Sequence, residues 1–577
     1  MAGRTATRQA VGLLVVVSFE GGAVHDVVIR GGSVVDGTGA GRRTADVAIS
    51  DGRIVAVGAD IGAARQVLDA DGLLVLPGWV DIHGHYDGQA LWDPLLETSS
   101  AHGVTTVVSG NCGVGFAPVQ PEQRAWTISL MEGVEDIPAV VLEQGLDWRW
   151  STFPEYLDAL DAAPHAIDVA VHVPHAALRV YAMGERGIDH AEVATDEEVT
   201  TMARLAAEAV DAGAVGFSSS RSRNHVASDG RLTPSFSAGA AELRGIAAAV
   251  GRTGKGVVEI NVDTANLDGD LELLVGLCEA SGRPVSMGLL QRPGQGNRFR
   301  QVLDAFAAAG GKGHRLLGQA AARPTGLLQS LAGRVNPLAA STTFQEVYQR
   351  DPDELHRDEV KAKILAELSD DADVTSRFPL AFELGDPPRY DRPPAESLAA
   401  RAAAAGIEVN ELVYDVLVGG GFVYVPVSNY LDGDLRAVHE MLVHPCTIPG
   451  LSDGGAHCTM IADFDYPTFL LSYWGRDAPE ELRMTVEWVV QQQCAATAAL
   501  VGMHDRGTLL PGRRADVNLV DFERVGSTAP EIVRDLPGGG ARLLSHGRGY
   551  VATLVAGEVT YEGGVYTGAL AGGLARV

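Results

Sequence analysis

The chain has 577 residues, of which 46% are hydrophobic and 21% are charged, a composition typical of folded globular proteins. This length exceeds what one compact core can use and predicts two or three structural units. The 45 basic and 74 acidic residues give a net charge of −29. Because such a surface repels nucleic-acid phosphates and anionic lipids, we expect neither nucleic acid nor a membrane as a partner.

The five cysteines are odd in number and widely spaced, which is not the pattern of a disulfide framework. We therefore expect a cytoplasmic protein. Residues 1–24 contain two arginines and a short apolar run without a small-x-small cleavage site, so a disordered leader is predicted there. No stretch approaches the roughly 20 apolar residues of a membrane span.

Both ends of the remaining chain have the pattern of a β-structure. Residues 25–77 and 505–577 contain short β-branched runs separated by glycine, aspartate or asparagine turns, which predicts antiparallel strands. Since the segment between them has a different pattern, we predict one small β-sandwich domain formed from both chain termini.

The middle of the chain, residues 78–504, alternates apolar strands with alanine-rich helical stretches such as 196–213. This alternation predicts an α/β fold, a (β/α)8 TIM-like barrel, in which the chemistry lies at the carboxyl ends of the strands. The eight predicted strands are 79–83, 104–112, 168–175, 214–220, 256–262, 284–290, 315–321 and 447–453.

The seventh and eighth predicted strands are separated by an unusually long stretch of chain. Within it, residues 345–370 and 395–417 have helical patterns. Long insertions in compact domains are often active-site covers. We therefore hypothesise that residues of about 345–420 form a lid over the barrel mouth.

His83 and His85 follow the first predicted barrel strand. On an extended backbone, residues two apart point to the same side, so both imidazoles can face one metal ion. Surface or hydrogen-bonded histidines are the alternative for so short a pattern. The place of this pair at the end of a barrel strand favours a metal site.

Five longer motifs accompany this pair: LPGWVDIHGHYDGQALWDP (76–94), SGNCGVGFAPV (109–119), PHAALRVYAMGERG (174–187), LSDGGAH (451–457) and GEVTYEGGVYTGAL (557–570). Together they resemble the amidohydrolase superfamily, and more narrowly the N-acyl-D-amino-acid deacylases, or D-aminoacylases. The resemblance covers nearly the whole chain, and the combination is far more specific than any single motif.

The resemblance implies roles for four residues. His83 and His85 match the first-strand metal pair, and Cys112 matches the second-strand cysteine that ligates zinc. A thiolate beside two histidines suits zinc on chemical grounds as well, although a lone cysteine is often a buried inert residue. Asp453 matches the eighth-strand general base, a carboxylate that accepts a proton from metal-activated water and passes it to the leaving amine.

Two strands depart from the pattern of D-aminoacylases, which have metal-binding histidines on the fifth and sixth strands. Residues 257–264 and 284–291 contain no histidine. Glu259, Asn261 and Asp263 share one strand face and could present an oxygen ligand, whereas Gln291 is a weaker candidate.

Other amidohydrolases bridge two metal ions with a carboxylated lysine on the fourth strand. None of the four lysines of this chain lies on that strand, so we do not expect such a bridge. The expected centre is one Zn2+ ion held by His83, His85 and Asp453, with Cys112 near or bound, and a second ion is left open.

Four further residues are predicted substrate contacts at strand ends: His175, Arg221, His225 and His457. An arginine suits a substrate carboxylate because its planar fork donates two parallel hydrogen bonds. Surface ion pairing is the alternative for an arginine on so acidic a chain.

The sequence thus predicts a metal-dependent hydrolase of a non-peptide C–N bond, acting on a small-molecule amide. By resemblance this substrate is an N-acyl-D-amino acid. The altered fifth and sixth strands leave a cyclic amide, a lactone or a xenobiotic amide open as a substrate, and also a catalytically silent relative that only binds a ligand. The sequence does not separate a monomer from a homo-oligomer.

Overall fold

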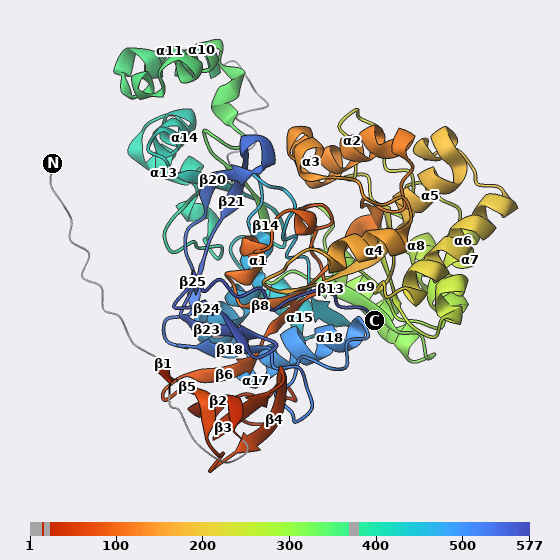
Figure 1. The fold of residues 1–577 in the computed structure, drawn as a ribbon. Helices are drawn as coiled ribbons and strands as arrows, with labels where there is room; N and C mark the ends of the chain where they lie inside the picture. The colour runs from red at the N-terminus through yellow and green to blue at the C-terminus, as the bar shows by residue number, and fades with distance from the viewer. Residues whose placement is uncertain (1–13, 17–23, 369–379) are drawn as a thin grey trace.

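The computed structural model describes residues 14–16, 24–368 and 380–577, and Figure 1 shows their arrangement. Within the predicted leader, Leu14–Val16 forms strand β1, which pairs antiparallel with β5 (Ala64–Asp69). The rest of that segment up to residue 23 lies outside the described residues. Among the described residues, no helix combines the length and the apolarity needed to cross a lipid bilayer.

The barrel is formed by eight strands that pair in parallel in the order β17-β13-β12-β11-β10-β9-β8-β7. Each of the eight predicted strands is present, so the predicted barrel is confirmed. The strands are β7 (Trp79–Asp81), β8 (Val104–Ser109), β9 (Asp168–Pro174), β10 (Gly216–Arg221), β11 (Val257–Val262), β12 (Val285–Leu289), β13 (Leu316–Ala320) and β17 (Thr447–Pro449).

The barrel closes just beyond the ends of its first and last strands. The backbone N–H of Asp453 donates to the carbonyl of His83 at 3.0 Å, and the N–H of His85 donates to the carbonyl of Gly454 at 2.7 Å. Gly84 and Gly454 form a parallel bridge between these two hydrogen bonds. The seam between the first and last strands therefore runs through three of the predicted site residues.

Helices cover the outside of the barrel, as expected for alternating β and α segments. The prediction for residues 196–213 is met by α6, which begins after the N-cap Thr195 with a capping box. The main covering helices are α2 (Arg124–Glu135), α4 (Phe153–Asp161), α5 (His175–Met183), α6 (Asp196–Asp211), α7 (Ala240–Arg252), α8 (Leu267–Ser281), α9 (Arg298–Gly310) and α15 (Arg436–Val443).

A ten-stranded sheet joins the two ends of the chain, as Figure 1 shows at its lower edge. Its N-terminal strands pair with its C-terminal strands through β6 and β18. Apolar side chains from both ends share one core. The remaining strands are β2 (His25–Val34), β3 (Arg43–Ser50), β4 (Arg53–Gly58), β6 (Leu74–Pro77), β18 (Val517–Val520), β23 (Tyr550–Val555), β24 (Glu558–Glu562) and β25 (Val565–Tyr566).

The expectation of antiparallel strands throughout this sheet is wrong for β2, which pairs in parallel with both β5 and β6. The hairpins of β2, β3 and β4 occupy one edge of β2. The strands that follow, β5 and β6, therefore pair with the other edge of β2, and both run in the same direction as β2. Gly31, with a φ of +71°, lies between the half of β2 that pairs with β5 and the half that pairs with β6.

The bottom of the barrel is closed by the end of the chain. Ala575 and Val577 pack with α18 (Thr497–Leu500) against apolar residues such as Val80 and Val257 at the start of the strands. The ammonium group of Lys255 donates to the backbone carbonyl oxygen of Val577 at 3.1 Å. The centre of this end of the barrel is consequently packed with apolar side chains.

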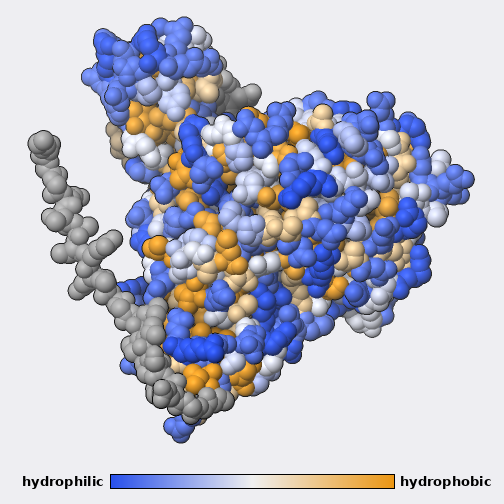
Figure 2. All heavy atoms as spheres, viewed as in Figure 1, coloured by the Kyte–Doolittle hydropathy of each residue, from blue (hydrophilic) through white to orange (hydrophobic). Residues whose placement is uncertain are grey.

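The insertion between the seventh and eighth barrel strands forms a unit with an apolar core of its own. A three-stranded sheet lies at its base, and its helices stand away from the barrel at the upper left of Figure 1. Figure 2 shows mainly hydrophilic residues on the face of α10 and α11 that is turned to the viewer. The elements are β14 (Thr325–Gln329), α10 (Thr342–Arg350), α11 (Asp358–Leu368), β15 (Phe382–Leu384), α13 (Leu398–Ala405), α14 (Val409–Val418) and β16 (Phe422–Ser428).

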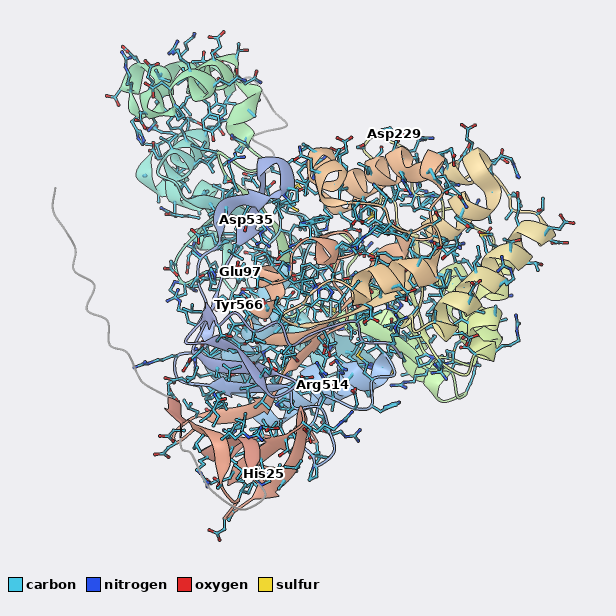
Figure 3. The ribbon with its side chains drawn as sticks, in the orientation of Figure 1. His25, Glu97, Asp229, Arg514, Asp535 and Tyr566 are labelled. Atoms are coloured by element: carbon cyan, nitrogen blue, oxygen red, sulfur yellow. The ribbon has the colours of Figure 1, made fainter. Side chains whose placement is uncertain are left out.

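A buried ion-pair network holds the barrel to the terminal sheet. Asp168 at the start of β9 accepts from Arg506 at 2.5 Å and from Arg514 at 2.9 Å. Arg514, labelled in Figure 3, lies at the boundary between the barrel and the sheet. The side chains of Asp168 and Arg506 are only 5% and 7% exposed.

We predict that Asp168→Asn lowers stability strongly, because it leaves two arginines without their shared buried carboxylate. Breaking a buried pair in this way costs about 3–5 kcal/mol. The matched control is Glu208→Gln, which removes the partner of Arg204 in an exposed pair worth about 0–1 kcal/mol. Calorimetry should show a much larger fall in the unfolding temperature for Asp168→Asn. Equal shifts would contradict the assigned role.

Candidate metal centre

His83 and His85 lie together at the carboxyl end of β7, as the two-residue spacing predicts. Both imidazoles are buried, and their ring centroids are 5.4 Å apart. The Oδ1 atom of Asp453 lies 3.5 Å from Nε2 of His83 and 3.7 Å from Nε2 of His85. The structure thus brings Asp453 next to a histidine pair that is far from it in the sequence.

Cys112 completes the group from the end of β8. Its Sγ atom lies 3.5 Å from Nε2 of His83, and potential ligand atoms of His83, His85 and Cys112 lie within 4.8 Å of one another. Zinc bonds of about 2.0–2.3 Å in a tetrahedron place neighbouring ligand atoms about 3.3–3.8 Å apart. The distances around His83 Nε2 and Asp453 Oδ1 match these edges.

The sequence Gly-Asn-Cys-Gly places Cys112 in this position. Cys112 has a left-handed backbone, with a φ of +58°, between two glycines that are also left-handed. A Cβ on Gly110 would lie 2.4 Å from the carbonyl oxygen of His172, and one on Gly113 would lie 2.7 Å from the Cα of Ser219. Only glycines allow the turn to approach β9 and β10 this closely.

The Asp-Gly-Gly tripeptide fits between strand ends for the same reason. A Cβ on Gly454 would lie 2.6 Å from Oγ of Ser99, and one on Gly455 would lie 2.8 Å from Cδ1 of Tyr86. Asp453 itself has a φ of +52°. Such conformations in non-glycine residues concentrate at functional sites, where surrounding contacts hold them.

Two side-chain amides orient the candidate ligands. Oε1 of Gln319 on β13 accepts from Nδ1–H of His83 at 2.7 Å, while its Nε2 donates to Ser286. His83 therefore carries its proton on Nδ1 and presents a lone pair on Nε2. Asn261 on β11 donates from Nδ2 to Sγ of Cys112 at 2.9 Å, and its Oδ1 accepts from the N–H of Gly288.

The two acidic groups closest to these ligands are also buried. Oε1 of Glu135, at the end of α2, lies 3.3 Å from Nδ1 of His85 without the geometry of a hydrogen bond. Glu259 accepts from the backbone N–H of Cys112 through Oε2 at 2.9 Å, and its Oε1 has no hydrogen-bond partner. Both residues add negative charge to the centre when they are ionised, and burial raises the pKa of each carboxyl.

The electrostatics of the site follow from burial and from these carboxylates. Burial lowers the pKa of His83 to about 4 and raises the pKa of Glu259 to about 8. Burial would also lower the pKa of His85, but Glu135 and Asp453 together raise it to about 9. Burial opposes the ionisation of Asp453, yet the two histidines hold its pKa well below the usual value.

This set of groups fits a divalent cation. Within the described parts of the chain, no lysine or arginine forms an ion pair with Asp453, Glu135 or Glu259. Burial, followed by the charge of Glu259, raises the pKa of the Cys112 thiol. A bound cation removes these penalties, because it pairs with the carboxylates and favours the thiolate. Nitrogen and sulfur donors of this kind favour zinc.

The four predicted substrate contacts are not equivalent in the structure. His457 donates its backbone N–H to the carbonyl of Glu135 at 2.5 Å. The ring of His225 is hydrogen-bonded through Nδ1 to Oγ of Ser220 on β10 at 2.7 Å, and burial lowers its pKa to about 4. Arg221, at the end of β10, donates through Nε to the carbonyl of Phe236.

The structure does not bring His175 to the centre. Its side chain is fully buried, and its ring nitrogens pair with Ser219 at 2.9 Å and with Glu242 at 2.9 Å. Glu242 is also held by Arg179. Gly113 packs closely against the backbone of Ser219. The hydrogen bond from His175 to Ser219 therefore helps to fix the position of the turn that contains Cys112.

The sequence analysis assigned no role to two residues at the centre, Gln319 and Glu135, and a different role to a third, Asn261. Gln319 lies in an otherwise apolar strand, and that single polar residue was the available signal. Glu135 ends a helix and carries no motif. Asn261, expected as an oxygen ligand, instead turns its NH2 group to Cys112. Of the other expected oxygen donors, Asp263 accepts from Ser222 and from the N–H of Arg223.

Comparison with known proteins agrees with this geometry. The amidohydrolase family profile matches residues 66–561. An N-acyl-D-glutamate deacylase of Alcaligenes xylosoxydans xylosoxydans is 30% identical over 510 residues, which cover 87% of this chain and 88% of that protein. A D-aminoacylase of the same organism is 37% identical over 195 residues, covering 33% of this chain and 37% of that protein. The matches to the first curated relatives span about a third of their length.

A solved structure extends the comparison to the fold. The N-acyl-D-glutamate deacylase of Bordetella bronchiseptica, in complex with zinc and a phosphonate inhibitor, has a TM-score of 0.63 and 25% identity. The similarity covers 96% of this chain and all of that one.

We predict that Gln319→Leu weakens zinc binding by about 10–100-fold, because His83 loses the acceptor that sets its tautomer. The affinity is measured by competition with a chromophoric chelator. Gln329→Leu is the matched control, since Gln329 is a buried glutamine on β14 in the insertion. If both variants bind zinc as tightly as the unmodified protein, the positioning role of Gln319 is wrong.

Proposed function

This chain belongs to the amidohydrolase family, and we propose that it is a zinc-dependent hydrolase that cleaves the amide bond of N-acyl-D-amino acids. The observation that carries the proposal is the convergence of His83, His85 and Cys112 with Asp453, in which three contacts of 3.5–3.7 Å match edges of a zinc tetrahedron. The similarity to an N-acyl-D-glutamate deacylase over 87% of the chain supports the substrate class.

We assign His83, His85 and Asp453 as zinc ligands and Cys112 as a ligand or immediate neighbour of the ion. Bound zinc supplies Lewis acidity, which polarises the amide carbonyl and makes water a stronger nucleophile at neutral pH. Asp453 is half-buried at the mouth, and its ionised carboxylate accepts a proton from the attacking water and returns it to the leaving amine.

We propose that the centre holds one zinc ion. The strand positions where related enzymes carry further histidines hold Glu259 and Asn261 on β11 and no histidine on β12. Asn261 is committed to Cys112 and Gly288, and one oxygen of Glu259 is committed to the backbone of Cys112. The chain therefore has few groups left for a second ion.

We propose Arg221, His225 and His457 as substrate contacts. Within the described residues, Arg221 forms no ion pair, so its guanidinium can bind the carboxylate of an N-acyl amino acid. His457 is joined to Glu135 through its backbone N–H, and His225 follows β10 with its ring bonded to Ser220. We also predicted that His175 contacts the substrate. Its buried position and the hydrogen bonds of both ring nitrogens do not favour this contact.

A lid of residues of about 345–420 stays a prediction that the structure does not favour, since the helices of that range stand away from the barrel (Figure 1). We propose instead that the flanks of the insertion border the barrel mouth. Arg334 in the insertion pairs with Asp136, which directly follows Glu135. On the other side, the side chain of Asn429 accepts from the N–H of Gln291, just beyond the end of β12. The insertion is thus anchored to two positions around the barrel mouth.

Removal of the metal is expected to abolish hydrolysis of N-acetyl-D-amino acids, and added zinc should restore it. Release of the free D-amino acid is followed before and after treatment with a chelator. Hydrolysis that survives complete removal of metal would contradict the mechanism. Absence of any zinc binding would instead favour a catalytically silent relative, and zinc binding without this hydrolysis would favour a cyclic amide, lactone or xenobiotic amide.

Asp453→Asn is expected to lower kcat by about 10²–10⁴-fold, the usual contribution of general acid–base catalysis. The control is Asp229→Asn, because Asp229 is exposed and pairs only with the neighbouring Arg231. Metal analysis of both variants separates loss of the base from loss of zinc. Full activity of Asp453→Asn with zinc bound would remove Asp453 from the reaction.

A further inference from the structure

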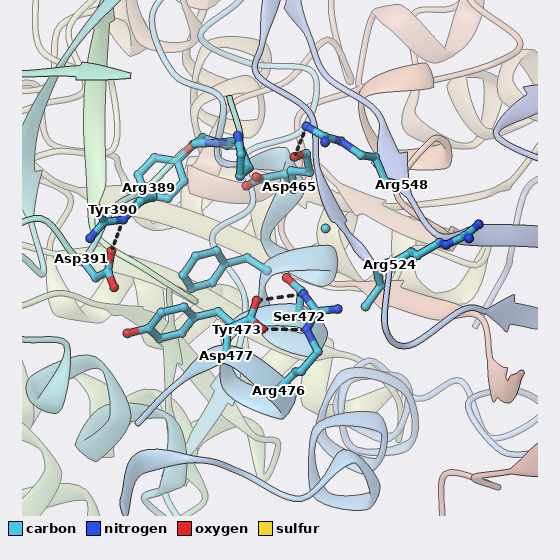
Figure 4. A pocket seen from close by; sticks show the side chains of 16 residues that line it. Arg389, Tyr390, Asp391, Asp465, Ser472, Tyr473, Arg476, Asp477, Arg524 and Arg548 are labelled. Carbon is cyan, nitrogen blue, oxygen red and sulfur yellow. Dashed lines mark hydrogen bonds and ion pairs between the residues drawn. The ribbon is translucent and has the colours of Figure 1, made fainter. Parts of the chain in front are cut away.

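A cavity of about 350 Å³ lies where three distant parts of the chain meet. Its walls come from residues 387–391 at the base of the insertion, from the π-helical segment Leu470–Asp477, and from residues 524–527 with Arg548 (Figure 4). This volume is within the range of small-molecule sites. None of the residues assigned to the metal centre or to the substrate lines it.

One side of the cavity is aromatic. The rings of Phe469 and Tyr473 stack with centroids 4.9 Å apart and planes inclined by 13°. Tyr390, from the insertion, meets Phe469 edge to face with centroids 6.0 Å apart. These rings offer a flat apolar surface against which a planar ligand can pack.

Arginines surround this surface, although the chain as a whole carries a charge of −29. The lining arginines are Arg389, Arg476, Arg524 and Arg548, and the lining carboxylates are Asp391, Asp465 and Asp477. Asp465 is ion-paired with Arg323 at 2.8 Å, and Arg323 also pairs with Asp463. The cavity is therefore locally richer in positive charge than the rest of the molecule.

Two of these arginines keep donors for a ligand. Within the described residues, the side chain of Arg524 makes no hydrogen bond and only a 3.4 Å ion pair with Asp521. Arg389 donates one hydrogen bond, from Nε to Asp391 at 3.3 Å, and its Nη1 lies 3.6 Å from a carboxylate oxygen of Glu396, which leaves Nη2 for a ligand. By contrast, Arg476 is held by Asp477 and by the carbonyl of Phe522. Arg389 and Arg524 lie on opposite sides of the cavity in Figure 4.

The local backbone is also unusual. The segment Leu470–Asp477 is π-helical over eight residues, and this segment supplies Ser472, Tyr473, Arg476 and Asp477 to the cavity. π-Helical turns are rare and occur frequently at functional sites, since the wider turn is less favourable than an α-helix. Here the widened turn directs both aromatic and charged side chains to one space.

We propose that this cavity binds a planar aromatic dicarboxylate as a ligand distinct from the substrate. The ring packs on Tyr473 and Phe469, and the two carboxylates meet Arg389 on the insertion side and Arg524 on the C-terminal side. Such a ligand joins the insertion to the body of the protein. The proposal stands independently of the reaction at the metal centre.

The test uses naphthalene-2,6-dicarboxylate as a fluorescent probe with the full-length zinc-loaded protein. Naphthalene-2-carboxylate and naphthalene-2-carboxamide serve as analogues with one charge and none. We expect the dicarboxylate to bind at least tenfold more tightly than the monocarboxylate, since each charge-assisted hydrogen bond contributes about 1.5–3 kcal/mol. The uncharged amide should bind weakest.

Arg389→Gln and Arg524→Gln should each weaken binding of the dicarboxylate about tenfold and reduce its advantage over the monocarboxylate. Arg436→Gln is the control, because Arg436 is exposed, ion-paired and outside the cavity. Removing the zinc should leave binding unchanged. The proposal is overturned if the probe does not bind saturably, if both arginine variants bind it as the unmodified protein does, or if binding requires zinc.

Discussion

The closure of the barrel between its first and last strands is the constraint on which the centre depends. Two backbone hydrogen bonds hold His83 and His85 against Asp453 and Gly454, so the same contacts that complete the fold set the positions of three candidate ligands. The glycines next to Cys112 and Asp453 follow from this arrangement, because a side chain there would collide with the neighbouring strands. The candidate ligands therefore come together when the first and last strands of the barrel pair.

The second constraint is electrostatic. The mouth of the barrel collects buried carboxylates and a thiol without a nearby lysine or arginine in the described residues, an arrangement that is unfavourable unless a cation is present. The carboxylates of Glu135 and Asp453 stabilise a proton on His85. A metal ion that binds His85 must displace this proton, because only the neutral imidazole is a ligand. The amides of Gln319 and Asn261 orient the candidate ligands without adding charge to the site.

The barrel and the convergence of the candidate ligands could be predicted from sequence, because apolar runs and His-x-His are local signals and because Cys112 and Asp453 lie in short motifs that resemble those of a known family. The roles of Glu135 and Gln319 could not be, because they depend on which strand and helix ends meet in space. The parallel pairing of β2 escaped prediction for a similar reason, since short runs reveal strands but not their neighbours. His175 stands beside a family motif, yet packing commits both of its nitrogens to the protein interior.

The apolar seal formed by Ala575 and Val577 has a consequence for biosynthesis. Ribosomes release a chain from its N-terminus, so all eight barrel strands emerge before the residues that cover the base. Until then, Val80, Val257 and their neighbours form an open apolar surface, and such surfaces promote aggregation. The base of the nascent barrel therefore stays uncovered until Ala575 and Val577 have left the ribosome.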